Sequence, residues 1–219
     1  PRNLLRGFFF MKFKKKKIKT RWHQQRIKDK FFHDAKKLGY RSRSTFKLLE
    51  INKKFRILKK GQNVLDLGSA PGGWSQIIVE KVFSKESKNV IVSVDLKEIK
   101  PIKNITFIKK DIFDKNFCSL LKNKFSDEFT VVTCDAAPST TGNKSLDHIR
   151  IIDLCKRSFE ISKKLLKKGG FLVIKIFDGN KTKEIINLIR TSFLEVNSFK
   201  PKSTKSGSKE LYVVAKFFK

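Results

Sequence analysis

Acidic residues are scarce in this chain of 219 residues. It has 51 Lys and Arg but only 20 Asp and Glu, which gives a formal net charge of +31 at pH 7. A charge this far from zero predicts a polyanionic partner, with nucleic acid as the first candidate. The alternative is a surface enriched in lysine without any binding role. That alternative does not explain why residues 1–60 contain 22 Lys and Arg and only three acids, Asp29, Asp34 and Glu50.

Cysteine, histidine and long apolar runs are also few. Cys118, Cys134 and Cys155 have no C-x-x-C spacing and the three histidines are scattered, so neither a disulfide framework nor a metal site is expected. The apolar run Phe8–Met11 is too short to span a bilayer and precedes a run of lysines. These absences predict no metal, no membrane partner and a reducing, cytoplasmic location. Residues 1–21 lack acids and could instead be a presequence, which leaves a mitochondrial or other organellar matrix open.

Short β-branched or aromatic runs alternate with helix-length segments along most of the chain. Strands are expected at 63–67, 90–95, 105–108, 129–134 and 171–177, and helices at 74–83, 146–166 and 183–193. This alternation is typical of a parallel, doubly wound sheet. Two further strand-like runs, 194–199 and 210–217, flank a Gly/Ser/Lys-rich loop and predict an antiparallel hairpin. The expected fold is α/β, with a mixed seven-stranded sheet that ends in this C-terminal hairpin.

No repeat or long linker divides the chain, but its N-terminal part is distinct. Residues 21–38 predict a basic helix that ends at Gly39, and a second helix is expected from Ser44, as N-cap, to Phe55. We therefore expect a basic extension over residues 1–38, partly disordered or helical, and one α/β domain over residues 39–219. Lysines and arginines along 12–43 alternate with aromatic residues on which bases could stack. The alternative for those aromatic residues is a place in the helix core.

A strand that breaks into a glycine-rich turn and then enters a helix lies at 64–75, with the sequence VLDLGSAPGGWS. Such a turn lets the backbone approach a ligand at the carboxyl end of a sheet. The spacing is neither G-x-G-x-x-G nor a phosphate-binding loop, which favours a nucleotide ligand without a pyrophosphate. Asp95 and Asp111 follow the next two strands, where they could accept hydrogen bonds from a ribose and an adenine amino group. Taken singly, either acid could be a turn or cap residue.

Lys175 is the single cation in the apolar run FLVIKIF at 171–177. An interior lysine in a central strand needs a charged partner or a lowered proton affinity, because burial of an unpaired charge is costly. Lys175 is therefore a candidate functional residue. Alternation alone leaves open whether its side chain enters a cleft or leaves the sheet.

The run DLGSAPGGW, the strand-end acids Asp95 and Asp111, and the later DAAP at 135–138 resemble the FtsJ (RrmJ) family of ribosomal RNA ribose 2′-O-methyltransferases, from about Leu38 to the C-terminus. The resemblance implies a Rossmann-like class I methyltransferase domain and S-adenosylmethionine as its cofactor. The cofactor contacts that it implies are Gly72, Trp74, Asp95, Asp111 and Asp135. A core position in its helix is the alternative for Trp74.

The same resemblance implies a catalytic tetrad formed by Lys47, Asp135, Lys175 and Glu210. Lys175 would deprotonate or polarise the ribose 2′-hydroxyl, and Asp135 would be its electrostatic partner. Lys47 and Glu210 would orient the other two. Whether Lys175 acts as a free amine or as a hydrogen-bond scaffold stays open.

The charge predicts an RNA substrate, and the resemblance alone implies the target, which is 2′-O-methylation of a uridine ribose in large-subunit (23S-type) ribosomal RNA on the assembled large ribosomal subunit. We expect the protein to be a monomer. One alternative is methylation of a ribose in transfer RNA or in a messenger cap. Another is a ribosome-assembly factor that binds RNA but has lost turnover. The lysine within an apolar strand argues against this factor, because binding alone does not require it.

Overall fold

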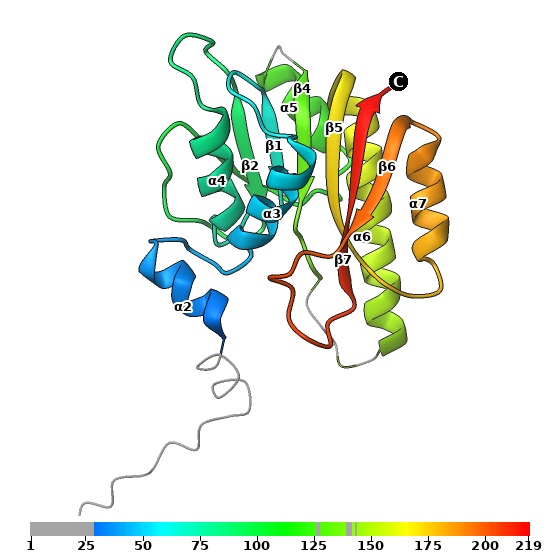
Figure 1. Cartoon of the computed structure of the whole chain (residues 1–219). Coiled ribbons are helices and arrows are strands. Elements are labelled where there is room, and N and C mark those ends of the chain that lie inside the picture. Colours follow the sequence, from blue (N-terminus) through cyan, green and yellow to red (C-terminus); the bar gives the residue numbers. More distant parts are fainter. Residues whose placement is uncertain (1–28, 126–127, 139–141, 143) are drawn as a thin grey trace, which may run out of the picture.

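A seven-stranded mixed sheet forms the central layer of the molecule (Figure 1). The structure is a computed structural model that describes residues 29–125, 128–138, 142 and 144–219. The strand order is β3-β2-β1-β4-β5-β7-β6, with β1 to β5 parallel and β7 antiparallel to both of its neighbours. The strands are β1 (Val64–Leu67), β2 (Ile91–Asp95), β3 (Thr106–Lys109), β4 (Phe129–Cys134), β5 (Leu166–Phe177), β6 (Phe193–Phe199) and β7 (Glu210–Phe218).

Helices cover both faces of this sheet. Helices α3 (Thr45–Phe55) and α4 (Gly73–Val82) pack on one face, and α5 (Phe117–Lys124), α6 (Lys144–Leu165) and α7 (Thr182–Arg190) on the other. Helix α2 (Lys30–Lys37) lies against α3, where the rings of Phe31 and Phe46 are 5.4 Å apart. No described helix is long and apolar enough to cross a membrane.

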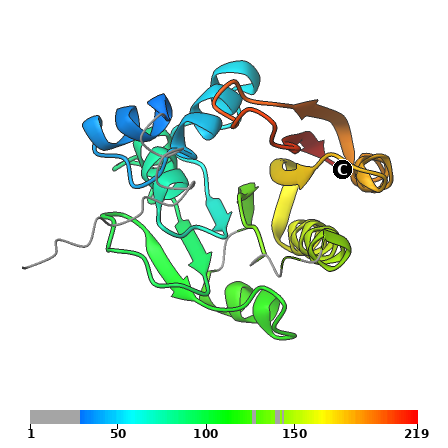
Figure 2. The ribbon, with the colours of Figure 1, turned by 90° about the horizontal axis from the view of Figure 1, so that it is seen from below.

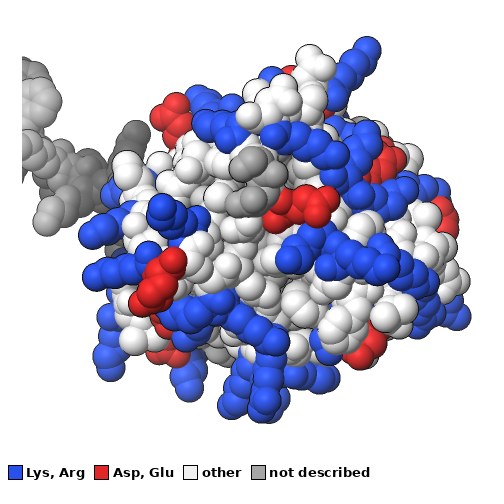
Figure 3. Space-filling view, turned by 90° about the horizontal axis from the view of Figure 1, so that it is seen from above, with Lys and Arg blue, Asp and Glu red and all other residues white. Residues whose placement is uncertain are grey.

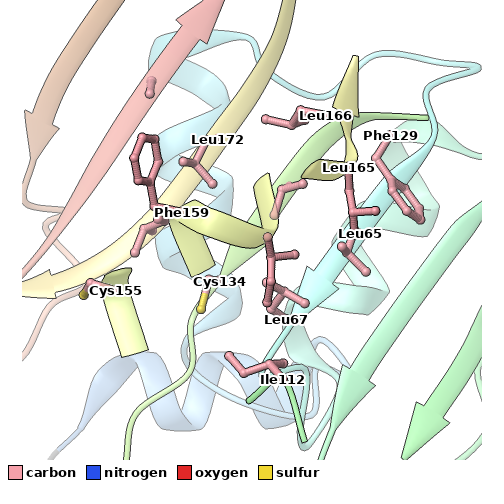
Figure 4. Packing of buried hydrophobic residues seen from close by; sticks show 14 of the residues in the cluster. Leu65, Leu67, Ile112, Phe129, Cys134, Cys155, Phe159, Leu165, Leu166 and Leu172 are labelled. Carbon is pink, nitrogen blue, oxygen red and sulfur yellow. The ribbon is translucent and has the colours of Figure 1, made fainter. Parts of the chain in front are cut away.

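Alternation along β5 decides which face each of its side chains occupies. Leu172, Ile174 and Ile176 join the core cluster under α5, α6 and α7, where Figure 4 shows Leu172 beside Phe159 of α6. Val173 joins the cluster under α3 and α4. Because successive strand residues point to opposite faces, Lys175 lies on the same side of the sheet as Val173. The lysine therefore faces the layer that contains α3.

The predicted doubly wound sheet with a C-terminal antiparallel hairpin is confirmed. The sequence does not predict α5, which is only eight residues long and buries just Phe117, Cys118 and Leu121, too few positions to establish a helical period. Ser44 occupies the N-cap position of α3, but the capping hydrogen bond expected there is absent. Its hydroxyl instead lies 2.7 Å from that of Ser42. Of the helix expected over 21–38, residues 30–37 form α2, and residues 21–28 lie outside the described part of the chain.

A carboxyl group is buried in the middle of β1. Asp66 accepts hydrogen bonds from the hydroxyls of Ser75, at 2.7 Å, and Thr133, at 2.8 Å, which link β1 to α4 and β4. Burial raises the pKa of Asp66 from 3.8 to about 7, although these two hydrogen bonds act in the opposite direction. Between about pH 4 and pH 7, Asp66 therefore stays protonated in the folded protein but is ionised in the unfolded chain.

This raised pKa predicts a pH dependence of stability. Because the folded state binds the extra proton, the contribution of Asp66 to the free energy of unfolding is fully present below pH 3.8 and is lost as the pH rises through about 7. Between pH 5 and pH 8 the loss is expected to be roughly 3 kcal/mol at most. Asp66→Asn has no such proton, and its unfolding free energy should lack this component. Urea denaturation of both proteins at several pH values measures the difference, and parallel pH curves would contradict the prediction.

Candidate active site

The candidate site lies at the edge where the parallel strands end, which Figure 2 shows from below. The loops that follow β1, β2, β3 and β4 meet at this edge. This arrangement brings together the sequence-predicted acids Asp95, Asp111 and Asp135, each of which is at or just after the end of its strand. Open α/β sheets bind ligands at this place.

The glycine-rich turn after β1 is packed too closely for side chains at two of its positions. Gly68 has a φ of +70°, and a Cβ built on it would lie 2.3 Å from the Cβ of Ala136, which follows β4. Gly72 has a φ of +103° and is the N-cap of α4. Only glycine adopts these conformations without strain at such close approach. The turn therefore lies directly against the loop after β4.

Asp95 fastens the end of β2 to this turn. One carboxylate oxygen accepts the N–H of Ala70 at 2.8 Å, and the other accepts that of Lys97 at 2.8 Å. Asp111 is exposed and accepts the N–H of Phe113 at 2.9 Å. Both acids thus accept backbone hydrogen bonds in turns, which is the alternative role considered for each of them in the sequence analysis. A carboxylate has about four lone-pair sites, so each retains acceptor capacity for a ligand.

Arg41, which precedes α3, ties a second loop to the turn. Its guanidinium donates to the carbonyl oxygens of Lys100, at 2.6 Å, and Pro101, at 2.9 Å, in the loop between β2 and β3. A longer contact of 3.4 Å reaches the carbonyl of Pro71 in the glycine-rich turn. The sequence indicates only a basic residue at this position. Its structural role appears only when the three loops are brought together in the fold.

Trp74 lies beneath the site rather than on its surface. Only 2% of the residue is exposed, and its indole N–H donates to the carbonyl oxygen of Ser44 at 2.9 Å. Its ring centroid is 5.6 Å from that of Tyr212. The side chain therefore has the core position that the sequence left open as an alternative. The backbone N–H of Trp74, in the first turn of α4, has no intrahelical partner and is the group that could reach a ligand.

The four charged residues of the expected tetrad lie together as two ion pairs. Lys175 is 3.1 Å from the carboxylate of Asp135, and Lys47 pairs with Glu210. Each of the four side chains is between 8% and 14% exposed. Lys175 also donates to the backbone carbonyl of Asp135. Four separate segments contribute to this cluster: α3, the end of β4, β5 and β7.

Tyr212 joins the two ion pairs and was not singled out by its sequence. Its hydroxyl lies 2.7 Å from Asp135 Oδ1 and 3.1 Å from Glu210 Oε1. Burial, followed by the charges of Asp135 and Glu210, raises the pKa of Tyr212 well above its ordinary value. The phenol therefore stays protonated and donates its single O–H to the carboxylates. One signal in the sequence could have identified it, because Tyr212 is two residues from Glu210 and so lies on the same strand face. Its register opposite Lys175 appears only in the folded sheet.

The chain matches the FtsJ-like methyltransferase family over residues 40–218. It is 43% identical over 201 residues to the ribosomal RNA large subunit methyltransferase E of Ehrlichia chaffeensis. The aligned region covers 91% of this chain and 93% of that protein. The protein of the same name from Rickettsia akari is 39% identical over 196 residues, covering 89% of this chain and 86% of that protein.

Solved structures show the same architecture. A Plasmodium falciparum protein described as a ribosomal RNA methyltransferase aligns with a TM-score of 0.73 and 32% identity, over 82% of this chain and 98% of that one. Aeropyrum pernix fibrillarin aligns with a TM-score of 0.57 and 16% identity, over 80% of this chain and 75% of that one. The Rossmann-like methyltransferase fold expected from the sequence is confirmed.

Removal of the Tyr212 hydroxyl should destabilise the folded protein. Tyr212→Phe leaves two nearly buried carboxylates without the O–H between them, and is expected to lower the unfolding free energy by about 1–3 kcal/mol. Tyr40→Phe is the matched control, because the Tyr40 hydroxyl makes no hydrogen bond to the described residues. It should change stability by less than about 0.5 kcal/mol. Chemical denaturation at pH 7 measures both, and equal effects would contradict the bridging role.

Proposed function

The chain belongs to the FtsJ-like methyltransferase family, and we propose that it methylates the 2′-hydroxyl of a uridine ribose in large-subunit ribosomal RNA on the assembled subunit. The observation that carries this proposal is the buried cluster of Lys47, Asp135, Lys175 and Glu210 at the carboxyl edge of the sheet. Support for the RNA comes from relatives named ribosomal RNA large subunit methyltransferase E. The net charge of +31 is consistent with such a substrate.

The edge of the sheet fits S-adenosylmethionine, the methyl donor of this family. The hydroxyl of Ser69, in the glycine-rich turn, is buried without a hydrogen-bond partner among the described residues, so it can still bond a ligand there. Gly68, next to it, lets the turn pack directly against Ala136 in the loop after β4. Gly72, the backbone of Trp74, and the acids Asp95, Asp111 and Asp135 would hold the cofactor. When bound, it supplies an electrophilic methyl group on a sulfonium, beside which the Asp135 carboxylate is electrostatically favourable.

Lys175 is placed to control the proton of the ribose 2′-hydroxyl. An ammonium group has three N–H bonds, and one of those on Lys175 donates to the backbone carbonyl of Asp135, while the charge is paired with the carboxylate of the same residue. A remaining N–H can donate to the hydroxyl oxygen and hold it in position. In the neutral form, the lone pair of Lys175 can accept the hydroxyl proton. Both forms require the alignment that Asp135 provides, since a displacement depends on the orientation of its reacting atoms.

Lys47 and Glu210 keep the second side of the cluster in place. Their ion pair connects α3 to the first residue of β7, and Tyr212 links Glu210 to Asp135. Lys47 therefore offsets the charge of a second carboxylate next to Lys175. We assign these two residues to orientation of the substrate and of Lys175.

The proposed reaction is tested with labelled S-adenosylmethionine. Assembled large ribosomal subunits, naked ribosomal RNA and transfer RNA are incubated with the protein and the label is mapped by nucleoside analysis. We expect 2′-O-methyluridine from large-subunit RNA, with the assembled subunit as the better substrate. Label on a base, only in transfer RNA, or in no RNA would overturn the proposal.

Lys175→Ala tests the assignment within the site. Loss of a group that acts on the proton of the nucleophile typically lowers a rate by a factor of about 10² to 10⁴, and we expect single-turnover methylation to fall by that factor. Cofactor affinity, measured by calorimetry, should stay within about twofold, because no proposed cofactor contact is removed. Lys216→Ala is the control. It also removes an ion-paired lysine from the sheet, but its partner is Glu195, at 2.9 Å, on β6. Near-normal methylation by Lys175→Ala would exclude the assigned role.

A further inference from the structure

The loop of residues 200–209, which joins β6 to β7, combines exposed lysines with a buried base. Lys202, Lys205 and Lys209 are exposed, whereas Pro201 and Ser203 are buried. No ion pair connects these three lysines to an acid of the described chain. A loop of this composition is usually held by few contacts. Here its base is fixed to the rest of the molecule.

Glu50 of α3 holds the start of the loop with both of its carboxylate oxygens. They accept the backbone N–H groups of Lys202, at 2.7 Å, and Ser203, at 2.9 Å. Figure 2 shows the loop lying beside α3 at this edge. Hydrogen bonds from N–H groups to a carboxylate are among the stronger ones in proteins. The lysine at 202 is thus attached to a fixed stretch of backbone.

Arg43 holds the same stretch from the other side. Its guanidinium donates to the carbonyl oxygen of Ser203 and also pairs with Asp29, while it lies 5.7 Å from the ring centroid of Phe31. Both the N–H and the C=O of Ser203 are therefore held by charged side chains. The buried backbone of Ser203 is therefore satisfied, whereas its hydroxyl is buried without a hydrogen-bond partner among the described residues.

Helix α3 connects the loop to the tetrad. Lys47 and Glu50 are three residues apart, so they lie on the same face of the helix. Glu50 binds the beginning of the loop and Lys47 pairs with Glu210, where the loop ends and β7 begins. One helix face thus holds the backbone at Lys202 and the end of the loop at Glu210.

We propose that the 200–209 loop is a clamp for the RNA backbone, in which Lys202 and Lys205 bind phosphates next to the methylated ribose and Glu50 is the positioning residue. This inference rests on the proposed function. Positive charge alone does not locate the RNA, because Lys and Arg also dominate the opposite edge of the sheet (Figure 3). What distinguishes the loop is that its backbone at Lys202 and Ser203 is bound to Glu50, on the helix face that also carries Lys47 of the tetrad. Phosphate contacts from such a loop add binding energy and set the register of the RNA on the protein.

The paired variants Lys202→Ala/Lys205→Ala and Lys167→Ala/Lys168→Ala test the clamp. Both remove two exposed lysines, but Lys167 and Lys168 are near the start of β5, at the opposite edge. KM is measured with the assembled large ribosomal subunit, and the salt dependence of binding with naked large-subunit ribosomal RNA. The loop variant should raise KM for the RNA roughly tenfold, with kcat and cofactor affinity unchanged. The slope of log affinity against log salt should decrease in magnitude by about 1.5, from two lost phosphate contacts. The control should leave KM unchanged.

Glu50→Gln examines the positioning role. The amide can accept only one of the two N–H groups, so it should also raise KM for RNA while cofactor binding persists. Combined with Lys202→Ala/Lys205→Ala, it should add little further effect, because both changes disable the same contacts. Additive effects on KM would show that Glu50 acts elsewhere. If circular dichroism shows that Glu50→Gln does not fold, the comparison of the two double-lysine variants still tests whether the loop binds the RNA backbone.

The failure of the clamp is distinguishable from failure of the proposed function. Equal KM and salt slope in the two double variants, with active wild-type protein, would overturn the clamp and leave the methylation standing. A wild-type protein that methylates no RNA would overturn the proposed function. In that case the equilibrium salt slopes of the two variants still decide whether the loop binds RNA.

Discussion

Much of the site follows from the need to pair one buried lysine. Lys175 lies in β5 with 8% of its side chain exposed, and an unpaired ammonium there would be costly. The carboxylate of Asp135 pairs with it, but a carboxylate at the end of a buried strand itself needs donors. Tyr212 supplies one and, through the same hydroxyl, reaches Glu210, which Lys47 balances. Five side chains from four segments are thus bound to one another, and their relative positions depend on the sheet and on α3 together.

The sheet could be predicted because its evidence is local. Each strand is a short apolar run, and the alternation of strands with helices favours parallel pairing. Tyr212 was harder to identify, because its spacing from Glu210 indicates only a shared strand face, whereas its position opposite Lys175 depends on the register of β5 and β7. The side of the sheet that Lys175 occupies could not be predicted either. Alternation along a strand shows which residues share a face, but only the packing of α3 shows which face of the sheet that is. Arg41 and Glu50 were hidden for the same reason, because their partners are 30 to 153 residues away.

Helix α3 and the turn before it join the two halves of the active centre. Arg41 contacts the loops on the side proposed for the cofactor, whereas Lys47 and Glu50 contact the strand and loop on the side proposed for RNA. The buried stripe of the helix, formed by Leu48 and Ile51, packs in the core cluster that also includes Trp74 and Tyr212. The polar contacts at the edge and the apolar contacts beneath it therefore stabilise the same placement of α3.

The arginines near the site differ from the lysines in what they contact. Arg41 and Arg43 direct their donors to backbone carbonyls and to Asp29, and Arg157, on the other face, does the same with the carbonyls of Ile112 and Asp114. The guanidinium groups of these three arginines are thus occupied within the protein and are not free to contact base edges in pairs of hydrogen bonds. Over the described residues the exposed positive charge is mainly lysine, a hydrated point charge that contacts phosphates and carries no base preference. Contacts from these lysines would accordingly depend on the folded shape of the RNA rather than on its base sequence.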